Sequence, residues 1–312
     1  MLGHQMDNIQ RKEWVKKYMD FMLSNDLENG LALKNKNFPT SFFKYRTLND
    51  YTLESIEYNS LWLAAINSLN DPYECLLLLD NDESLRAFFS DKNFSKNFKD
   101  MFGLEISESD IKEIIESEKP YEAYVSFCTI EGIALNVSPP KQIELIQKRW
   151  DEIVESGKEN IRICSFSERN DSLLMWSHYA NQHQGICVEY DFLDDNEFRA
   201  FLQPVFYDDK LFKLKTMDHV TGLSQLIGSL VKSKDWEYEN EWRLTLLQTV
   251  TKKEKIQSSN PKAIYLGPRF KLNNNYKILQ LQRICGQHNI PVFQMKIHPT
   301  EYKVIVDHEV TL

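Results

Sequence analysis

An acidic segment near residue 240 carries side chains that could do chemistry. In DWEYENEWRL (235–244), Glu239, Glu241 and Arg243 alternate with other residues, among them the apolar Trp242. Successive side chains of an extended strand point to opposite faces, so the two carboxylates and the arginine are expected on one face. Burying charged groups without partners costs free energy. The pattern therefore predicts either a site that uses the carboxylates or a solvated strand edge with a Glu–Arg ion pair.

The segment SFSERNDSLLMWSHYANQHQGICVEY (165–190) is a second concentration of polar side chains. Its strand-like start places Ser165 and Ser167 on one face. His178 and His183 suggest a metal site, but zinc-binding histidines on a helix usually stand four residues apart. A spacing of five separates the rings by roughly 140° on a helix with 3.6 residues per turn. We therefore expect no metal, and we expect His178 to form packing hydrogen bonds or to line a site.

The turn sequence NDPYE (70–74) follows an apolar, strand-like run. Asn70 and Pro72 are typical turn residues, and turn formation alone would explain them. Asp71 and Glu74 are polar groups close behind a strand, and loops at strand ends often line sites. Asn70, Asp71 and Glu74 are therefore further site candidates.

Strands must hold these groups in place, and short runs rich in apolar and β-branched residues predict them. The predicted strands are residues 42–46, 61–64, 123–128, 161–167, 186–190, 204–207, 242–247, 263–267, 291–297 and 302–306. With the helix between them, the strands at 263–267 and 291–297 form a predicted β-α-β unit.

Helices are predicted from apolar residues at helical spacing and from capping residues. The predicted helices are residues 11–24, 52–58, 107–118, 172–183, 218–233, 276–288 and a helix that Ser138 and Pro139 open. Ser107 and Asp110 form a predicted capping box, and Gly157 is a predicted C-terminal cap. The mixture predicts a single α+β domain over 1–312, with a mixed β-sheet core, surrounding helices and a helical elaboration at 80–160.

Composition argues against several classes of protein. The 312 residues include 46 acidic and 37 basic side chains, and the net charge of −9 argues against an extended nucleic-acid surface. No apolar run approaches the ~20 residues of a membrane span, and no apolar signal core stands near the N-terminus. The five cysteines form no C-x-x-C pair, as is common in a reducing compartment. We therefore expect a soluble cytoplasmic protein with no membrane partner.

Six short motifs follow one another along the chain. They are KYR (44–46), NDPYE (70–74), SFS (165–167), LLMWSHYANQHQG (173–185), WEYENEWR (236–243) and IYLG (264–267). Their order resembles a bacterial family known as domain of unknown function 2971, over most of the chain from 42 to 306. The M-W-S-H-Y-A and W-x-x-E-x-E-W-R blocks are the specific ones. The family name implies no activity.

A second set of residues follows one another along the chain. It consists of Arg46, then an S-x-S motif (Ser165, Ser167), then an E-x-E motif (Glu239, Glu241). This order is similar to the R…S-T-S…E-x-E arrangement of ADP-ribosyltransferases that use NAD. The resemblance implies a split sheet with a helical insertion. It also implies an arginine that holds the dinucleotide, a serine-bearing strand at the nicotinamide ribose, and a late glutamate that bonds a ribose hydroxyl.

The resemblance assigns roles that suit cleavage of the nicotinamide–ribose bond of NAD, which would be the substrate. Cleavage builds positive charge on the ribose, as glycoside cleavage does, and Glu241 would stabilise that charge. Glu239 would position the acceptor, and Ser165 would bond Glu241 or a ribose hydroxyl, supported by Ser167. Arg46 would bind the diphosphate or a ribose through charge-assisted hydrogen bonds. The rings implied to line the nicotinamide pocket are Tyr45, Trp176, His178 and Tyr179.

Three alternatives stay open at the level of sequence. The chain could be a nucleotide- or small-ligand-binding module without catalysis, in which both glutamates only form ion pairs. It could be a metal-dependent hydrolase or nuclease that uses Asp71, Glu74, Glu239 and Glu241, since magnesium sites use a few carboxylates. It could also be a partner-binding protein. The residues leave open whether the chain is an enzyme, which acceptor it would use, and whether it is a bacterial toxin or defence effector.

Overall fold

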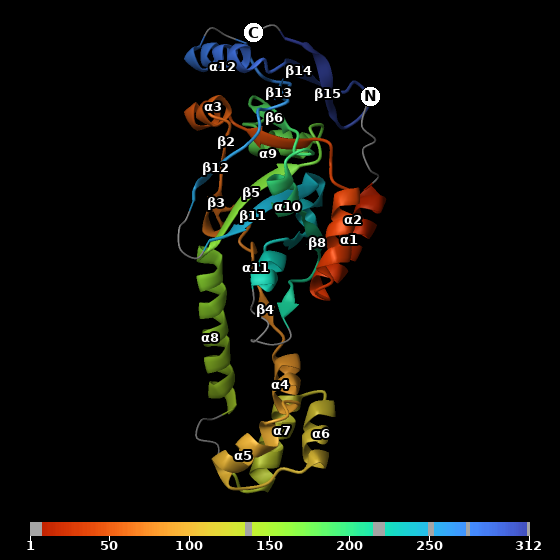
Figure 1. The fold of residues 1–312 in the computed structure, drawn as a ribbon, viewed down its shortest axis with the longest axis vertical. Helices are drawn as coiled ribbons and strands as arrows, with labels where there is room; N and C mark the ends of the chain where they lie inside the picture. The colour runs from red at the N-terminus through yellow and green to blue at the C-terminus, as the bar shows by residue number, and fades with distance from the viewer. Residues whose placement is uncertain (1–7, 135–138, 215–221, 249–252, 273–274, 311–312) are drawn as a thin grey trace. The chain divides into compact units, whose positions relative to one another are not determined.

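The computed structural model describes residues 8–134, 139–214, 222–248, 253–272 and 275–310 (Figure 1). The chain is organised into two compact units. Unit 1 comprises Met1–Glu74, Asn160–Lys210 and Ser229–Leu312, and unit 2 comprises Cys75–Glu159 and Leu211–Gly228. Unit 2 contains nearly all of the segment at 80–160 that the sequence predicts as a helical elaboration.

The core of unit 1 is a nine-stranded sheet, and the predicted α+β class is confirmed. Its strands are β1 (Phe42–Arg46), β3 (Ala64–Ala65), β5 (Ile161–Ser167), β6 (Ile186–Tyr190), β7 (Leu202–Pro204), β11 (Glu241–Leu247), β13 (Ala263–Leu266), β14 (Val292–Ile297) and β15 (Val304–Glu309). The order is β15-β14-β13-β6-β1-β5-β11-β7, and β3 also pairs with β5. β13 and β14 are parallel and are joined by α12 (Tyr276–His288), so the predicted β-α-β unit is confirmed.

The sheet is weakly joined between β1 and β5. In the described strands, this ladder has one position, Phe43 opposite Ser167. By contrast, β5 and β11 pair along their whole length, up to Ser167 opposite Glu241. β1 also pairs with β6 over its full length. The ladder between β1 and β5 therefore ends beyond Phe43, next to residues of β1 that line the cavity described below.

The other helices of unit 1 pack on this sheet or beside it. They are α1 (Asn8–Leu23), α2 (Leu27–Lys36), α3 (Asp50–Glu57), α9 (Leu173–Tyr179) and α10 (Asn196–Phe201). α1 and α2 lie side by side (Figure 1). α1 buries Val15, Tyr18 and Met22, as its helical spacing predicts, and Trp14 packs on Trp242 of β11 with ring centroids 5.9 Å apart.

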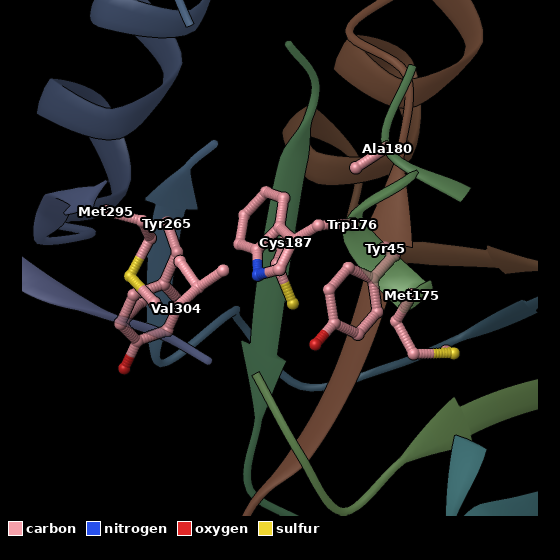
Figure 2. Close-up of a cluster of buried hydrophobic side chains, with 9 residues drawn as sticks. Tyr45, Met175, Trp176, Ala180, Cys187, Tyr265, Met295 and Val304 are labelled. Carbon is pink, nitrogen blue, oxygen red and sulfur yellow. The ribbon is translucent and has the colours of Figure 1, made fainter. Parts of the chain in front are cut away.

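α9 is anchored by an apolar cluster on the half of the sheet that contains β1, β6 and β13 (Figure 2). The cluster consists of Tyr45, Met175, Trp176, Ala180, Cys187, Ala263, Tyr265, Met295 and Val304. Tyr45 and Trp176 meet edge to face at 5.2 Å, and the indole N–H of Trp176 donates to the carbonyl of Asn170 at 2.7 Å. This packing fixes the position of Tyr179 at the end of α9.

Short elements complete unit 1 around the sheet. β2 (Ser60–Trp62) pairs with β12 (Lys255–Gln257), and β8 (Phe206–Asp208) pairs with β10 (Val231–Ser233). The 3₁₀ helix η1 (Ile66–Ser68) follows β3, and η3 (Lys234–Glu239) leads from β10 into β11. These elements bring Lys232 and Lys255 into the arrangement described below.

Unit 2 is mainly helical. Its elements are β4 (Leu78–Leu79), α4 (Asn81–Phe89), α5 (Phe94–Phe102), α6 (Glu108–Glu116), α7 (Pro120–Ile130), α8 (Pro139–Glu159), β9 (Lys213–Leu214) and α11 (Gly222–Gly228). Phe89, Phe94 and Phe98 form the centre of its aromatic core. The capping box that Ser107 and Asp110 predict is present at the start of α6.

Several local predictions are wrong. Residues 123–128 lie inside α7 rather than in a strand, because Pro120 opens a helix there and Tyr124 and Phe127 pack on the phenylalanine core. Gly157 lies within α8 and does not cap it. The helix predicted at 218–233 is instead α11 followed by strand β10; its residues 218–221 lie outside the described residues.

The helix predicted at 172–183 is also shorter than expected. α9 ends at Tyr179, and Asn181, Gln182 and His183 adopt left-handed backbone conformations with positive φ. Gly185 then allows the backbone of this turn to approach the backbone of Arg46 closely, since a Cβ at Gly185 would lie 2.3 Å from the carbonyl oxygen of Arg46. The turn after α9 is thus packed tightly against the end of β1.

Candidate functional site

A buried cluster of charged side chains lies where η3 enters β11. Glu239 ends η3, Asn240 takes a left-handed conformation with φ of 42°, and Glu241 begins β11. Asparagine tolerates this conformation better than most residues. The Nζ of Lys232 on β10 lies 2.7 Å from Glu239 Oε2 and 3.2 Å from Glu241 Oε2. The two glutamates therefore converge on one ammonium group, although they do not lie on one extended strand.

Arg243 completes the cluster from β11. Its Nε and Nη2 lie 2.8 and 3.1 Å from the two carboxylate oxygens of Glu241. Its Nη1 and Nη2 lie 2.6 and 2.7 Å from the two oxygens of Glu74. Nη1 also donates to the carbonyl of Ser229 at 2.6 Å. The Glu–Arg ion pair that the sequence suggested is formed, but it is buried rather than placed at a solvated edge.

Tyr179 and Asn70 extend this cluster. The Tyr179 hydroxyl donates to Glu239 Oε1 at 2.7 Å and accepts a hydrogen bond from the Asn70 side-chain amide at 3.3 Å. Burial raises the pKa of Tyr179, and the Glu239 charge raises it further. The tyrosine therefore stays protonated and serves as a hydrogen-bond donor to the carboxylate.

The two glutamates of the E-x-E motif differ in acidity. Burial raises the pKa of Glu239, and the charge of Glu241 raises it further. Burial acts in the same direction on Glu241, but the charges of Arg243 and Lys232 outweigh it and hold the pKa of Glu241 well below its ordinary value. Glu241 is therefore the firmly ionised member of the pair, and Glu239 is the weaker acid.

The two serines of β5 support these glutamates. Ser165 and Ser167 stand opposite Arg243 and Glu241 in the ladder. A hydrogen bond to the Ser165 side chain helps to lower the pKa of Glu241. Ser167 Oγ donates to the carbonyl of Glu239 at 2.6 Å. One serine thus contacts a carboxylate, and the other holds the backbone that presents the second carboxylate.

A cavity of about 560 Å³ lies next to β1 and α3. Small-molecule sites commonly have volumes of about 300–1,000 Å³. The charged side chains on its wall are Lys44, Arg46, Lys255 and Glu54. In a chain with net charge −9, this local excess of positive charge favours an anionic ligand.

Arg46 is the cation on this wall whose charge is available. Within the described parts of the chain, its side chain makes no hydrogen bond or ion pair. Lys255 is paired with Glu54 at 2.6 Å. The ammonium of Lys44 donates to the Ser165 carbonyl at 2.7 Å; burial lowers the pKa of this group, and the charge of Arg46 also acts to lower it. An anion entering the cavity would therefore find Arg46 free to bind it.

The cavity and the charged cluster share one predicted residue, Tyr179. Strand alternation places Arg46 on one face of β1 and Phe43 on the other. Phe43 stands opposite Ser167, which in turn stands opposite Glu241. Arg46 and Glu241 thus lie on adjacent parts of the sheet but not on one face. Tyr179 is the group that touches both places.

The remaining predicted site residues lie outside the cluster. Trp176 is fully buried, so its ring has no free face for a ligand. Tyr45 lines the cavity but is nearly buried, and its hydroxyl donates to the Arg169 carbonyl at 2.8 Å. His178 is exposed and shares a hydrogen bond with the Tyr238 hydroxyl at 3.0 Å. Asp71 accepts the Tyr73 N–H at 2.9 Å and shapes the turn.

Three lysines of this region, Lys44, Lys232 and Lys255, are not among the site residues predicted from the sequence. Lys232 and Lys44 each occupy a strand with apolar neighbours, in LVKS and FFKYR. A lysine within a short apolar strand is a sign of a buried counter-charge, because an unpaired buried ammonium is costly. Lys255 lies in a polar segment that carries no such sign.

The fold and the site define an α+β protein with a buried ionic cluster beside a cation-rich cavity. Residues 175–244 match the model of a family described as protein of unknown function (DUF2971). This match confirms the family that the motifs predict, over the segment from α9 to β11. No curated protein and no solved structure shows significant similarity to the chain.

Two further properties bear on the class of protein. No described helix is both long and apolar enough to cross a membrane. Among the residues that the structure places, no three histidine, cysteine, aspartate or glutamate side chains form a group suited to a metal ion. The carboxylates of Glu74, Glu239 and Glu241 are instead bonded to Arg243 and Lys232.

Proposed function

We propose that the chain binds a nucleotide or dinucleotide in the cavity beside β1, with Arg46 holding the phosphate. The observation that carries this proposal is Arg46, whose side chain has no hydrogen-bond or ion-pair partner among the described residues, on the wall of a cavity of about 560 Å³. A guanidinium binds phosphate oxygens through paired, charge-assisted hydrogen bonds. The N-cap residue Asn49 and the first-turn residues Tyr51 and Thr52 of α3 also line the cavity, and the start of a helix favours negative charge.

Calorimetry tests this proposal directly. NAD, ADP-ribose and AMP are titrated into the wild type, Arg46→Ala and Arg283→Ala. Arg283 is an exposed arginine paired with Glu57 at 2.6 Å, so it controls for loss of a positive charge elsewhere. We expect binding that Arg46→Ala weakens at least tenfold and Arg283→Ala leaves unchanged. Equal affinities of the wild type and Arg46→Ala, or no binding of any of the three, would refute the proposal.

A second candidate function is cleavage of NAD with transfer of ADP-ribose. It is favoured by Tyr179, which lines the cavity and whose hydroxyl donates to Glu239 of the E-x-E motif. The strands that carry Arg46, Ser165 and Glu241 are also neighbours, in the order β1-β5-β11. In this function Glu241 stabilises the charge that develops on the ribose, and the acceptor is unknown. Opening of the ion pairs around Glu241 is required, because its carboxylate is closed to solvent.

Release of nicotinamide from NAD separates the two functions. The wild type is compared with Tyr179→Phe and Glu239→Gln, each with its own melting curve. Release that both folded variants abolish supports the transferase. If NAD binds but no nicotinamide is released, even with a cell extract as a source of acceptors, the chain is a binding module and not a transferase. Arrest of growth on expression, relieved by the same variants, would mark the transferase as a toxin or defence effector.

We further propose a cytoplasmic location. Its support is chemical, since all five cysteines are free and buried, which suits a reducing compartment. Cell fractionation tests this point, and recovery of the protein in a periplasmic or secreted fraction would refute it.

A further inference from the structure

Two large aromatic side chains on the cavity wall are exposed. Tyr51, in the first turn of α3, is 81% exposed, and Trp62, at the end of β2, is 46% exposed. The other aromatic residues that line the cavity are different. Tyr45 and Tyr190 are nearly buried, and Tyr179 is half-buried with its hydroxyl bonded to Glu239. Tyr51 and Trp62 are thus the rings on this wall that can offer a face to a ligand.

The elements that carry these rings are tied together. Trp62 stands opposite Lys255 in the β2–β12 pair. Lys255 forms an ion pair with Glu54, which lies one turn after Tyr51 on α3. The β2–β12 pair and this ion pair therefore link the two elements that carry the rings, and the charges of the ion pair neutralise each other. They leave the anion-binding role to Arg46.

We propose that Trp62 and Tyr51 bind the planar base of the nucleotide by stacking, while Arg46 holds its phosphate. This inference rests on the proposed nucleotide binding and adds the place and chemical class of the base. Base stacking on an aromatic side chain is strong and tolerates different bases, because every base presents a π-face. The site should therefore prefer a purine nucleotide over a ribose phosphate that lacks a base. It should discriminate less between adenine and guanine.

The different surroundings of Arg46 and of the two exposed rings explain why the phosphate and the base bind at different places on the cavity wall. Arg46 is half-buried at the end of β1, whereas Tyr51 and Trp62 are the exposed aromatic groups of the wall. A phosphate binds a cation that is partly shielded from water more strongly than one that is fully exposed. A base needs an apolar face that water covers in the free protein, so that its removal is favourable. Each half of a nucleotide thus meets the environment that suits it.

The test compares AMP, GMP and ribose 5-phosphate by calorimetry on the wild type, Trp62→Ala, Tyr51→Ala and Tyr58→Ala. Tyr58 is the matched control, because it caps α3, is 63% exposed and does not line the cavity. We expect Trp62→Ala to weaken AMP and GMP about tenfold to a hundredfold and Tyr51→Ala to weaken them less. Neither should change the affinity for ribose 5-phosphate. Tyr58→Ala should match the wild type.

The outcomes separate the two proposals. If Arg46→Ala weakens AMP binding while Trp62→Ala and Tyr51→Ala behave as Tyr58→Ala does, the base lies elsewhere and this inference is wrong, although nucleotide binding stands. An equal loss of AMP and ribose 5-phosphate affinity in Trp62→Ala would also overturn it, because stacking acts on the base alone. If the wild type binds no nucleotide, both proposals fail. Quenching of tryptophan fluorescence by AMP that is absent in Trp62→Phe gives an independent readout.

Discussion

Arg243 and Glu74 form a bidentate, buried ion pair with N–O distances of 2.6 and 2.7 Å. The same guanidinium binds the carbonyl of Ser229. Glu74 is the last residue of unit 1 before the chain first enters unit 2, and Ser229 is the residue at which the chain returns to unit 1 for the second time. Arg243 thus joins the end of the first segment of unit 1 to the start of its third segment, and it brings the N-D-P-Y-E turn next to the E-W-R block.

Arg243→Lys should destabilise the protein by about 2 kcal/mol or more, since a lysine cannot bind two carboxylates in parallel and leaves buried oxygens unpaired. Urea unfolding measures this loss. Arg283→Lys is the control, because the Arg283–Glu57 pair is partly exposed and should contribute at most about 1 kcal/mol. Similar unfolding midpoints for the two variants would show that the buried pair contributes no more than a surface pair.

Glu239→Gln and Glu241→Gln should differ in their effect on stability. The fold disfavours the charge on Glu239 and favours it on Glu241, as the opposite directions of their pKa shifts show. We expect Glu239→Gln to change the unfolding free energy by less than about 1 kcal/mol and Glu241→Gln to lower it by about 3 kcal/mol. Unfolding at neutral pH checks the order. A larger loss of unfolding free energy in Glu239→Gln than in Glu241→Gln would mean that Glu239 is the main counter-charge of Lys232.

The same shifts predict a dependence on pH. The folded pKa of Glu241 lies below its ordinary value of 4.5, so the stability that its charge contributes is fully present above that value. It is lost as the pH falls toward the folded pKa, because the unfolded chain then binds the proton first. The raised pKa of Glu239 gives its ionisation the opposite effect on stability. The comparison is therefore best made in a Glu239→Gln background.

In that background, the wild-type Glu241 protein should lose stability more steeply than Glu241→Gln between about pH 5 and pH 3. Urea midpoints at several pH values measure the two slopes. Parallel slopes would show that Glu241 is not the group whose ionisation stabilises the fold at acid pH.

Arg11 should anchor α1 to the sheet. Its Nε lies 2.8 Å from Glu168, and its Nη2 donates to the Glu241 carbonyl at 3.0 Å. Arg11→Met removes both contacts and leaves the Glu168 carboxylate without its cation, so we expect a loss of about 2–3 kcal/mol in unfolding free energy. Lys12→Met is the control, since Lys12 is mostly exposed in its pair with Glu237 and should matter little. Equal losses would contradict the anchoring role.

The members of the charged cluster could be selected from the sequence, but their pairing could not. Glu74, Glu239, Glu241 and Arg243 stand out because charged groups flank apolar strands. Their convergence depends on the left-handed turn at Asn240 and on the β5–β11 register, which places Glu241 beside Ser167. These are properties of the folded chain, and a local pattern of alternation predicts instead that both glutamates share one strand face.

The cavity depends even more on tertiary structure. Arg46 lines it because the β1–β5 ladder ends after Phe43, and no local sequence pattern encodes where two distant strands part. The strands themselves were predictable, since FFKYR and IRICSFS have the β-branched and aromatic composition of a sheet. Residues 123–128 have the same composition yet lie in helix α7. In such a short apolar run the strand and helix periodicities cannot be told apart, and packing within unit 2 decides between the two structures.

Gly185 offers a prediction that links the turn after α9 to the cavity. A Cβ at this position would lie 2.3 Å from the Arg46 carbonyl oxygen and 2.8 Å from the carbonyl carbon of Ala180. Both atoms belong to the backbone and cannot move cheaply. Gly185→Ala should therefore lower the unfolding free energy by about 1–3 kcal/mol, as overpacking does. It should also weaken nucleotide binding, because the end of β1 that carries Arg46 must shift.

Gly286→Ala is the matched control for this change. Gly286 lies inside α12 with no heavy atom within 4 Å of an added Cβ, so alanine should raise stability by about 0.5–1 kcal/mol. Unfolding and AMP titration of both variants make the comparison. Retention of full stability and affinity by Gly185→Ala would show that the chain relieves the contact without moving Arg46, and the coupling between the turn and the cavity would be refuted. Loss of affinity in Gly185→Ala alone would place that coupling in the backbone of Arg46.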